Sequence, residues 1–226
     1  MTYQDTRDRL ETYFDRTASR TWEALTSDAP VSRIRQTVRE GRDAMRAELL
    51  SILPTDLRGA HVLDAGAGAG QMSIELAERG AMVTAIDISP SLLAVAERRT
   101  PEHLKGRISY RPGDMLDPEL GHFDAVIAMD SLIHYTAADI ARALDRLTRQ
   151  SSGPVAFTVA PKTALLTAMW WAGKAFPRSD RSPAIQPHKA ATISNHLAKL
   201  GSSADLSVHA RISRGFYISQ AMEARA

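Results

Sequence analysis

Three glycines in the sequence VLDAGAGAGQ could form a turn that brings a ligand close to the backbone. Gly66, Gly68 and Gly70 alternate with small residues after a short apolar run, and Asp64 and Gln71 flank them. Glycine permits a sharp turn and lets a ligand approach the amides at the start of the next helix. Because position 71 is glutamine, the spacing departs from G-x-G-x-x-G, the pattern that binds a dinucleotide.

Two further acidic residues follow apolar runs. Asp87 ends the run AMVTAID, about 20 residues after the glycine turn, where a carboxylate can accept both hydroxyls of a ribose. Asp114 and Met115 follow the weaker run ISYRP. In a parallel sheet the carboxyl ends of such runs meet at one edge, so we expect these residues to lie close together.

The elements that must position these residues alternate between strand and helix. We expect strands at 61–66, 81–87, 108–114, 123–130 and 153–161, and helices at about 72–79, 89–99 and 138–150. A further helix at 188–201 and strands at 204–212 and 215–222 follow, whereas residues 1–57 carry only helical patterns. The alternation predicts an α/β protein with a mostly parallel seven-stranded sheet, helices on both faces and right-handed crossovers.

The motif D-x-G-x-G-x-G, followed by acids at the ends of the next two strands, resembles class I (Rossmann-like) S-adenosylmethionine-dependent methyltransferases. The resemblance implies S-adenosyl-L-methionine as the cofactor and S-adenosyl-L-homocysteine as the product. In this class the acid after the third strand reads the adenine amino group and an apolar neighbour covers the ring. We therefore expect the cofactor-binding residues to be Tyr13, Asp64, Gly66, Gly68, Gln71, Asp87, Ile88, Asp114, Met115 and Met129.

Composition excludes several function classes. The 226 residues suit a single domain, spanning 1–226, and 28 Lys+Arg against 26 Asp+Glu give no basic footprint for nucleic acid. The absence of cysteine excludes disulfides, zinc thiolate sites and methylation of cytosine C5. The histidines are scattered, and we assign no pair of them to a metal site. The segment after the fourth strand reads MDSLIHY, without the Pro-Pro element of base-amino methyltransferases. A small molecule is the expected methyl acceptor.

Segments at the two ends of the chain and after the fourth and fifth strands indicate which class of small molecule is methylated. The opening YFD with Arg20, Thr21 and Trp22, the segment MDSLIHY, the stretch PKTALLTAMWWAGKAFPRSDRSP and the closing RGFYISQAMEAR resemble magnesium-protoporphyrin IX O-methyltransferases. The resemblance implies esterification of one porphyrin propionate in bacteriochlorophyll or chlorophyll biosynthesis, with magnesium present only as part of the substrate. It also implies the porphyrin-binding subunit of magnesium chelatase as a candidate partner. A methyltransferase acting on another hydrophobic small molecule, such as a quinone precursor or small acid, and a non-catalytic cofactor-binding subunit remain alternatives.

The resemblance assigns Tyr13 and His134 to catalysis. Tyr13 would close over the cofactor, and His134 would orient the propionate, take a proton from it, or contact the substrate magnesium axially. Substrate contacts are expected from Trp170 and from three arginines that could pair with the second propionate, since Arg binds carboxylates in bidentate fashion: Arg178, Arg181 and Arg214. The insertion at 161–190 would cover the substrate pocket, with a plain core role for its apolar residues as the alternative.

Residues 1–57 are expected to form a helical lid. Val38, Met45 and Leu49 recur at helical steps that mark a buried face. Arg35, Arg39, Arg42 and Arg46 form a stripe beside it, which we interpret as a solvated face, with a strip for anionic lipid or a partner protein as the alternative. The polar first ten residues do not resemble a signal peptide. We expect a cytoplasmic protein, with peripheral membrane contact left open.

Overall fold

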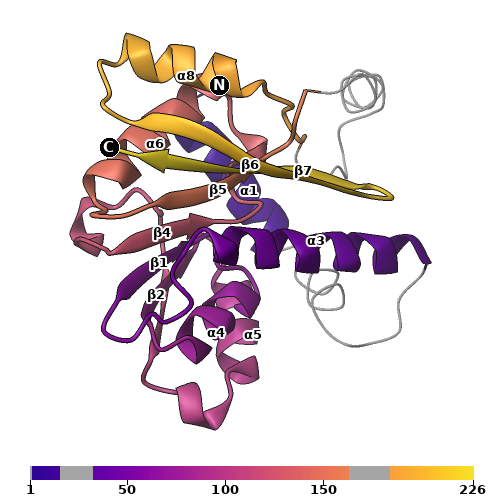
Figure 1. The fold of residues 1–226 in the computed structure, drawn as a ribbon. Helices are drawn as coiled ribbons and strands as arrows, with labels where there is room; N and C mark the ends of the chain where they lie inside the picture. The colour runs from indigo at the N-terminus through magenta and orange to yellow at the C-terminus, as the bar shows by residue number, and fades with distance from the viewer. Residues whose placement is uncertain (1, 16–32, 163–183) are drawn as a thin grey trace.

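The computed structural model describes residues 2–15, 33–162 and 184–226. Within these residues the strands form one seven-stranded sheet in the order β3-β2-β1-β4-β5-β7-β6 (Figure 1). The strand β7 runs antiparallel to β5 and β6, and the other pairs are parallel. The predicted class I methyltransferase fold is confirmed.

The strands and helices have the following bounds, in chain order. They are α1 (Tyr3–Tyr13), α3 (Arg33–Ser51), β1 (His61–Ala65), α4 (Gln71–Glu78), β2 (Met82–Asp87), α5 (Pro90–Arg99), η2 (Glu102–Leu104), β3 (Ile108–Pro112), η3 (Pro118–Leu120), β4 (Ala125–Ala128), η4 (Leu132–His134), α6 (Ala137–Arg149), β5 (Val155–Val159), α8 (Ala190–Lys199), β6 (Asp205–Arg214) and β7 (Tyr217–Arg225). Helices α1 and α3 confirm the helical prediction for most of the described N-terminal residues, whereas residues 52–57, also expected to be helical, form bends and loop that lead to β1.

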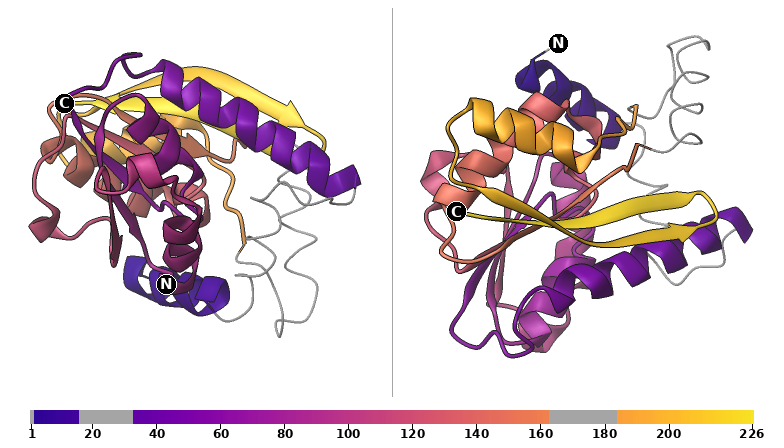
Figure 2. Two further views of the ribbon diagram at one scale, coloured as in Figure 1. Left: turned by 90° about the horizontal axis from the view of Figure 1, so that it is seen from below. Right: turned by 45° about the horizontal axis from the view of Figure 1, so that its top comes forward.

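Helices cover both faces of the sheet and make two cores (Figure 2). On one face Met45 and Leu49 of α3 and Leu76 of α4 pack against β1, β2 and β4. On the other face Leu144 of α6 and Leu197 of α8 pack against β4, β5 and β7. Every residue of β4 and β5 is buried, because both strands are covered on both faces.

Helix α3 runs beside the β6–β7 hairpin in every view and contacts both strands (Figures 1 and 2). Gly41 of α3 lies against Tyr217, the first residue of β7. Farther along α3, Met45 and Leu49 are fully buried, so this part of the helix packs on the sheet. The site described below lies between α3, α1 and the ends of the central strands.

Local signals fix where the helices begin. In α1 the side chain of Thr2 accepts from the Asp5 amide at 3.2 Å, and the Asp5 carboxylate accepts from the Thr2 amide at 2.7 Å. In α5 the predicted N-cap is confirmed, because Ser89 accepts from the Leu92 amide and Pro90 is the first helical residue. Among the helices that the structure describes, none has the length and apolar character needed to cross a bilayer.

Candidate functional site

A cavity of about 300 Å³ lies at the carboxyl ends of the central parallel strands. The turns after β1, β2 and β3 line it together with the segment after β4, and α1, α3 and β7 close its sides. Ligands of doubly wound sheets bind at this edge, near the point where the strand order reverses. Here the order reverses between β1 and β4, beside the glycine turn.

The glycine turn has backbone angles that glycine adopts more readily than other residues. Gly66, Gly68 and Gly70 have φ angles of 86°, 53° and 81°, in the left-handed region. A Cβ on Gly66 would lie 2.4 Å from the Cβ of Ser131, whereas a Cβ on Gly68 would meet no atom within 4 Å. Since Gly68 lines the cavity, the space beside it fits a ligand that approaches the backbone.

Two buried carboxylates flank this turn. The Asp87 carboxylate accepts from the Gly68 amide and from the Ser89 amide, at 2.8 Å for each. Each of its oxygens keeps a lone pair, so the pair of oxygens fits the two hydroxyls of a ribose. Burial nevertheless raises the pKa of Asp87, in spite of the two amide bonds. Asp64 accepts from the Ser73 hydroxyl at 2.5 Å, and burial raises its pKa to about 7.

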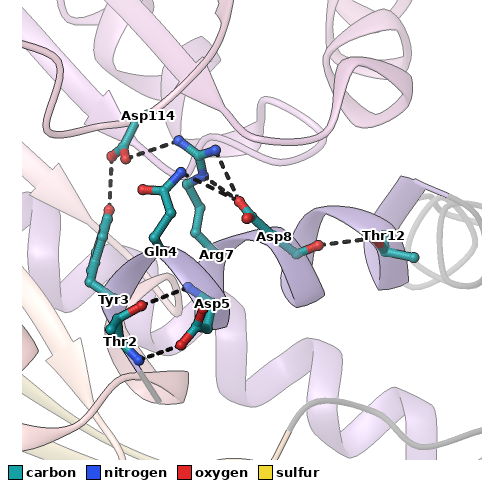
Figure 3. A network of polar contacts seen from close by, with 8 residues as sticks. All are labelled: Thr2, Tyr3, Gln4, Asp5, Arg7, Asp8, Thr12 and Asp114. Atoms are coloured by element: carbon teal, nitrogen blue, oxygen red, sulfur yellow. Dashed lines mark hydrogen bonds and ion pairs between the residues drawn. The ribbon is translucent and has the colours of Figure 1, made fainter.

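Asp114 connects the turn after β3 to α1 (Figure 3). The Tyr3 hydroxyl donates to Oδ1 of Asp114 at 2.8 Å, and the Arg7 guanidinium lies 3.4 Å from Oδ2. Burial is the largest effect that raises the pKa of Tyr3, and the nearby Tyr135 and Asp114 raise it further. The hydroxyl therefore stays protonated and can donate to Asp114. The neighbours of Asp114, Gly113 and Met115, line the cavity. The loop expected to hold adenine is therefore also the docking point of α1.

The residues that follow α1 contact the loop after β2 and the start of α5. Asp15 accepts from the Ser89 hydroxyl at 3.1 Å and from the Ser91 amide at 3.2 Å. Between these two anchors, Leu10 and Phe14 face the cavity. Helix α1 and the residues that follow it thus contact both loops that the sequence assigns to the adenosine.

His134 lies on η4, directly after β4, and lines the cavity. It is 9% exposed, and its Nδ1 atom lies 3.5 Å from the Ala184 carbonyl. The Gln186 side chain donates to the His134 carbonyl at 2.8 Å, and the Phe14 ring lies 6.3 Å from the imidazole, centre to centre. Residues 184–186 and Phe14, which follows α1, therefore contact His134 from two sides.

The structure brings most of the predicted site residues together. Nine line the cavity: Asp64, Gly66, Gly68, Gln71, Asp87, Ile88, Met115, Met129 and His134. Asp114 faces α1 instead, and Tyr13 packs edge-on against Phe14 with ring centres 5.3 Å apart. Arg214 is exposed at the end of β6, outside the cavity lining, and Trp170, Arg178 and Arg181 lie outside the described residues.

The sequence interpretation of the arginine stripe was wrong for two of its members. Arg42 and Arg46 line the cavity, and their side chains are 18% and 12% exposed. Arg46 pairs with Asp43 at 2.7 Å and with Glu75, and Arg42 pairs with Asp130 at 3.2 Å. The pair Asp43–Arg46 lies within α3, but the spacing along α3 does not indicate the contacts of Arg46 with Glu75 on α4 or of Arg42 with Asp130 after β4.

Two more cavity residues had no predicted role. Asp130 was noted only as part of MDSLIHY, and Tyr217 only as part of the closing motif, yet both line the cavity and are hydrogen-bonded to each other. One sequence signal could have indicated a close contact here: Gly41 interrupts an otherwise helical pattern, and the Tyr217 ring packs against it. Within the part of the chain that the structure describes, no group of three or more His, Asp or Glu side chains is arranged to hold a metal ion.

Comparison with known proteins agrees with this geometry. The family described as "Magnesium-protoporphyrin IX methyltransferase C-terminus" matches residues 128–226, and a methyltransferase domain family matches residues 62–151. The magnesium-protoporphyrin O-methyltransferase of Rhodobacter capsulatus is 53% identical over 224 residues, 99% of this chain and 98% of the relative. This chain belongs to the magnesium-protoporphyrin O-methyltransferase family.

A solved structure shares the family's architecture throughout. The magnesium protoporphyrin IX methyltransferase of Synechocystis, crystallised with bound S-adenosylhomocysteine, covers 100% of both chains with 29% identity and a TM-score of 0.79. A ubiquinone biosynthesis O-methyltransferase of Xanthomonas oryzae pv. oryzae is 43% identical, but over 82 residues that cover 35% of this chain. Similarity to the magnesium-protoporphyrin O-methyltransferase family therefore extends over the whole chain, while similarity to the quinone enzyme is confined to one part.

Proposed function

We propose that this protein transfers the methyl group of S-adenosylmethionine to a propionate carboxylate of magnesium-protoporphyrin IX. The products are the monomethyl ester and S-adenosylhomocysteine, and the step belongs to bacteriochlorophyll or chlorophyll biosynthesis. The observation that carries the proposal is the 53% identity to the Rhodobacter capsulatus enzyme along nearly the entire chain. The cavity supports it, because the glycine turn and Asp87 fit an adenosyl ligand.

The reaction makes modest demands on the chain's own groups. A propionate should titrate near the Glu value of about 4.3 and is ionised at neutral pH, so no strong base is required. The bound donor supplies an electrophilic methyl group. The protein must align the carboxylate with that methyl and exclude water from it. The apolar side chains of Leu10, Phe14 and Val38 on the cavity wall suit the second task.

Within this proposal His134 orients the propionate. Its ring lines the cavity, held between residues 184–186 and Phe14. A hydrogen bond from the imidazole would fix one carboxylate oxygen and leave the other to attack. Tyr13 is assigned to the donor side, because it lies beside Phe14 at the end of α1, next to the loop after β2.

The test compares two histidine variants. His134→Ala should lower kcat for magnesium-protoporphyrin at least about tenfold, while the affinity for S-adenosylhomocysteine stays within about twofold of wild type. His103→Ala is the matched control, since His103 is exposed and pairs with Glu78 away from the cavity. Unchanged turnover in His134→Ala would remove His134 from the mechanism.

The proposal extends to partners. Phe216 and Ile185 are 64% and 43% exposed, and both lie on the cavity lining. Apolar side chains there suit a hydrophobic substrate delivered by the porphyrin-binding subunit of magnesium chelatase, or a peripheral contact with a membrane. Phe216→Ser should weaken co-sedimentation with lipid vesicles or capture by that subunit. If neither changes, these partner assignments fail while the methyl transfer proposal stands.

A further inference from the structure

The backbone at Asp130 adopts a conformation that costs free energy. Of the non-glycine residues that the structure describes, Asp130 alone has a positive φ, at 56°. Aspartate adopts this region more readily than most side chains, but a non-glycine residue there still costs up to about 1 kcal/mol. Such strain persists only where surrounding contacts enforce it, and it concentrates at functional sites. Asp130 follows β4, precedes η4, and lines the cavity.

Three side chains from three different elements hold Asp130. Arg42 of α3 lies 3.2 Å from Oδ2, and the Tyr217 hydroxyl of β7 donates to Oδ1 at 3.0 Å. Thr158 of β5 accepts from the Asp130 amide at 2.7 Å and lies 3.3 Å from Oδ1. Both the backbone and the carboxylate of Asp130 are therefore fixed. We refer to Arg42, Asp130, Thr158 and Tyr217 as the Asp130 cluster.

A glycine within α3, which lowers helix stability, makes room for the Tyr217 side chain of the Asp130 cluster. Gly41 lies within α3, where glycine is about 0.5–1 kcal/mol less favourable than alanine. A Cβ at this position would lie 2.7 Å from the Tyr217 ring, so glycine lets the ring pack directly on the helix. Burial and the Asp130 charge raise the pKa of Tyr217, which keeps its hydroxyl a donor to Asp130.

The turn made by Asp130 directs the chain into η4. The next residue, Ser131, lies against the glycine turn, because a Cβ on Gly66 would come within 2.4 Å of its Cβ. Three residues further on, His134 faces the cavity. The backbone angle at Asp130 thus sets how η4 lies relative to the turn expected to hold the donor.

We propose that Asp130 is a positioning residue for methyl transfer: the Asp130 cluster fixes η4 and so holds His134 on the cavity wall. The inference rests on the proposed function. Asp130, Arg42 and Tyr217 act together in this proposal. They orient His134 and do not contact the reacting atoms themselves.

Three substitutions test the cluster. Tyr217→Phe removes the hydroxyl that lies within hydrogen-bond distance of both Asp130 oxygens. Asp130→Asn removes the charge at nearly constant size, and Asp130→Gly keeps the backbone angle accessible but removes the side chain. Each should lower kcat about tenfold or more, with KM for magnesium-protoporphyrin and the affinity for S-adenosylhomocysteine within about threefold. Tyr110→Phe is the matched control: its hydroxyl lies 2.8 Å from that of Thr100, outside the cavity lining, and kcat should not change.

A double-mutant cycle separates positioning from a merely structural role. In a His134→Ala background, Tyr217→Phe should cost less than about twofold in kcat, because the residue it positions is gone. A full tenfold loss in that background would overturn the proposal, and so would unchanged turnover in His134→Ala itself.

A readout that needs no turnover keeps the inference separate from the proposed function. Amide hydrogen exchange over residues 131–135 should be at least about fivefold faster in Asp130→Gly and Tyr217→Phe than in wild type, and unchanged in Tyr110→Phe. Wild-type exchange in both cluster variants would contradict the positioning role, even if the protein proved to methylate another substrate. Faster exchange without activity on magnesium-protoporphyrin would support the positioning of η4 and reject the substrate.

Discussion

Replacing Gly68 by alanine tests whether the open space at the glycine turn belongs to a ligand. The residue has a φ of 53°, and a Cβ there would meet no protein atom within 4 Å. The folded protein should therefore lose only the cost of a left-handed alanine, about 1 kcal/mol. For a chain of this size that lowers Tm by roughly 2–4 °C.

The ligand should respond much more strongly than the fold. Because Gly68 lines the cavity, the added methyl group occupies space that the donor would fill. Inserting a methyl group into a packed contact costs typically 1–3 kcal/mol, which weakens binding roughly 5- to 150-fold. Isothermal titration with S-adenosylhomocysteine measures this loss directly, and thermal unfolding without ligand measures the backbone cost.

A glycine outside the site provides the control. Gly201 follows α8 with a φ of 67°, and a Cβ there also meets nothing within 4 Å. Gly201→Ala should lower Tm by a similar amount and leave the affinity for S-adenosylhomocysteine unchanged. Wild-type affinity in Gly68→Ala, or an equal loss of affinity in Gly201→Ala, would refute the placement of the ligand beside the turn.

Three further predictions concern the carboxylates around the cavity. Asp87→Asn should weaken S-adenosylhomocysteine binding at least about tenfold in titration calorimetry, because one ribose acceptor becomes a donor; wild-type affinity would undo that assignment. Tyr3→Phe removes the bond to Asp114 and should speed hydrogen exchange in α1 about fivefold, and equal exchange would mean that the bond does not hold the helix. Asp64 binds its proton more tightly in the folded state, with a pKa of about 7. The proton bound to Asp64 therefore stabilises the folded state fully below about pH 4, and this stabilisation is lost as the pH rises to about 7. Urea unfolding should show Asp64→Asn less sensitive to pH over that window than wild type, and an identical pH profile would contradict the raised pKa.

Local sequence signals predicted the parts of the site that are built by one segment or by the ends of two adjacent parallel strands. The glycines after β1 adopt left-handed backbone angles. Asp87 accepts hydrogen bonds from amides in its own turn and in the neighbouring turn, and Ser89 caps the helix that follows. Each depends on residues close in sequence or on the ends of adjacent parallel strands. Fold class and cofactor turn could therefore be read from pattern and spacing.

The remaining parts depend on packing between distant elements. Arg42, Asp130 and Tyr217 come from three elements, and no periodicity indicates that they meet. The carboxylate of Asp114 faces α1 because Tyr3 and Arg7 reach it, which requires the docked helix rather than a motif. Tertiary contacts of this kind decide which polar residues of an amphipathic helix face solvent and which face a ligand.

The most direct test of the account is the product of the reaction. The full chain is incubated with magnesium-protoporphyrin IX and S-adenosylmethionine, and the porphyrin is analysed by mass spectrometry. We predict a single methyl ester formed in equal amount with S-adenosylhomocysteine. Recovery of unmodified porphyrin, under conditions in which S-adenosylhomocysteine binds to the same protein, would contradict the proposed substrate.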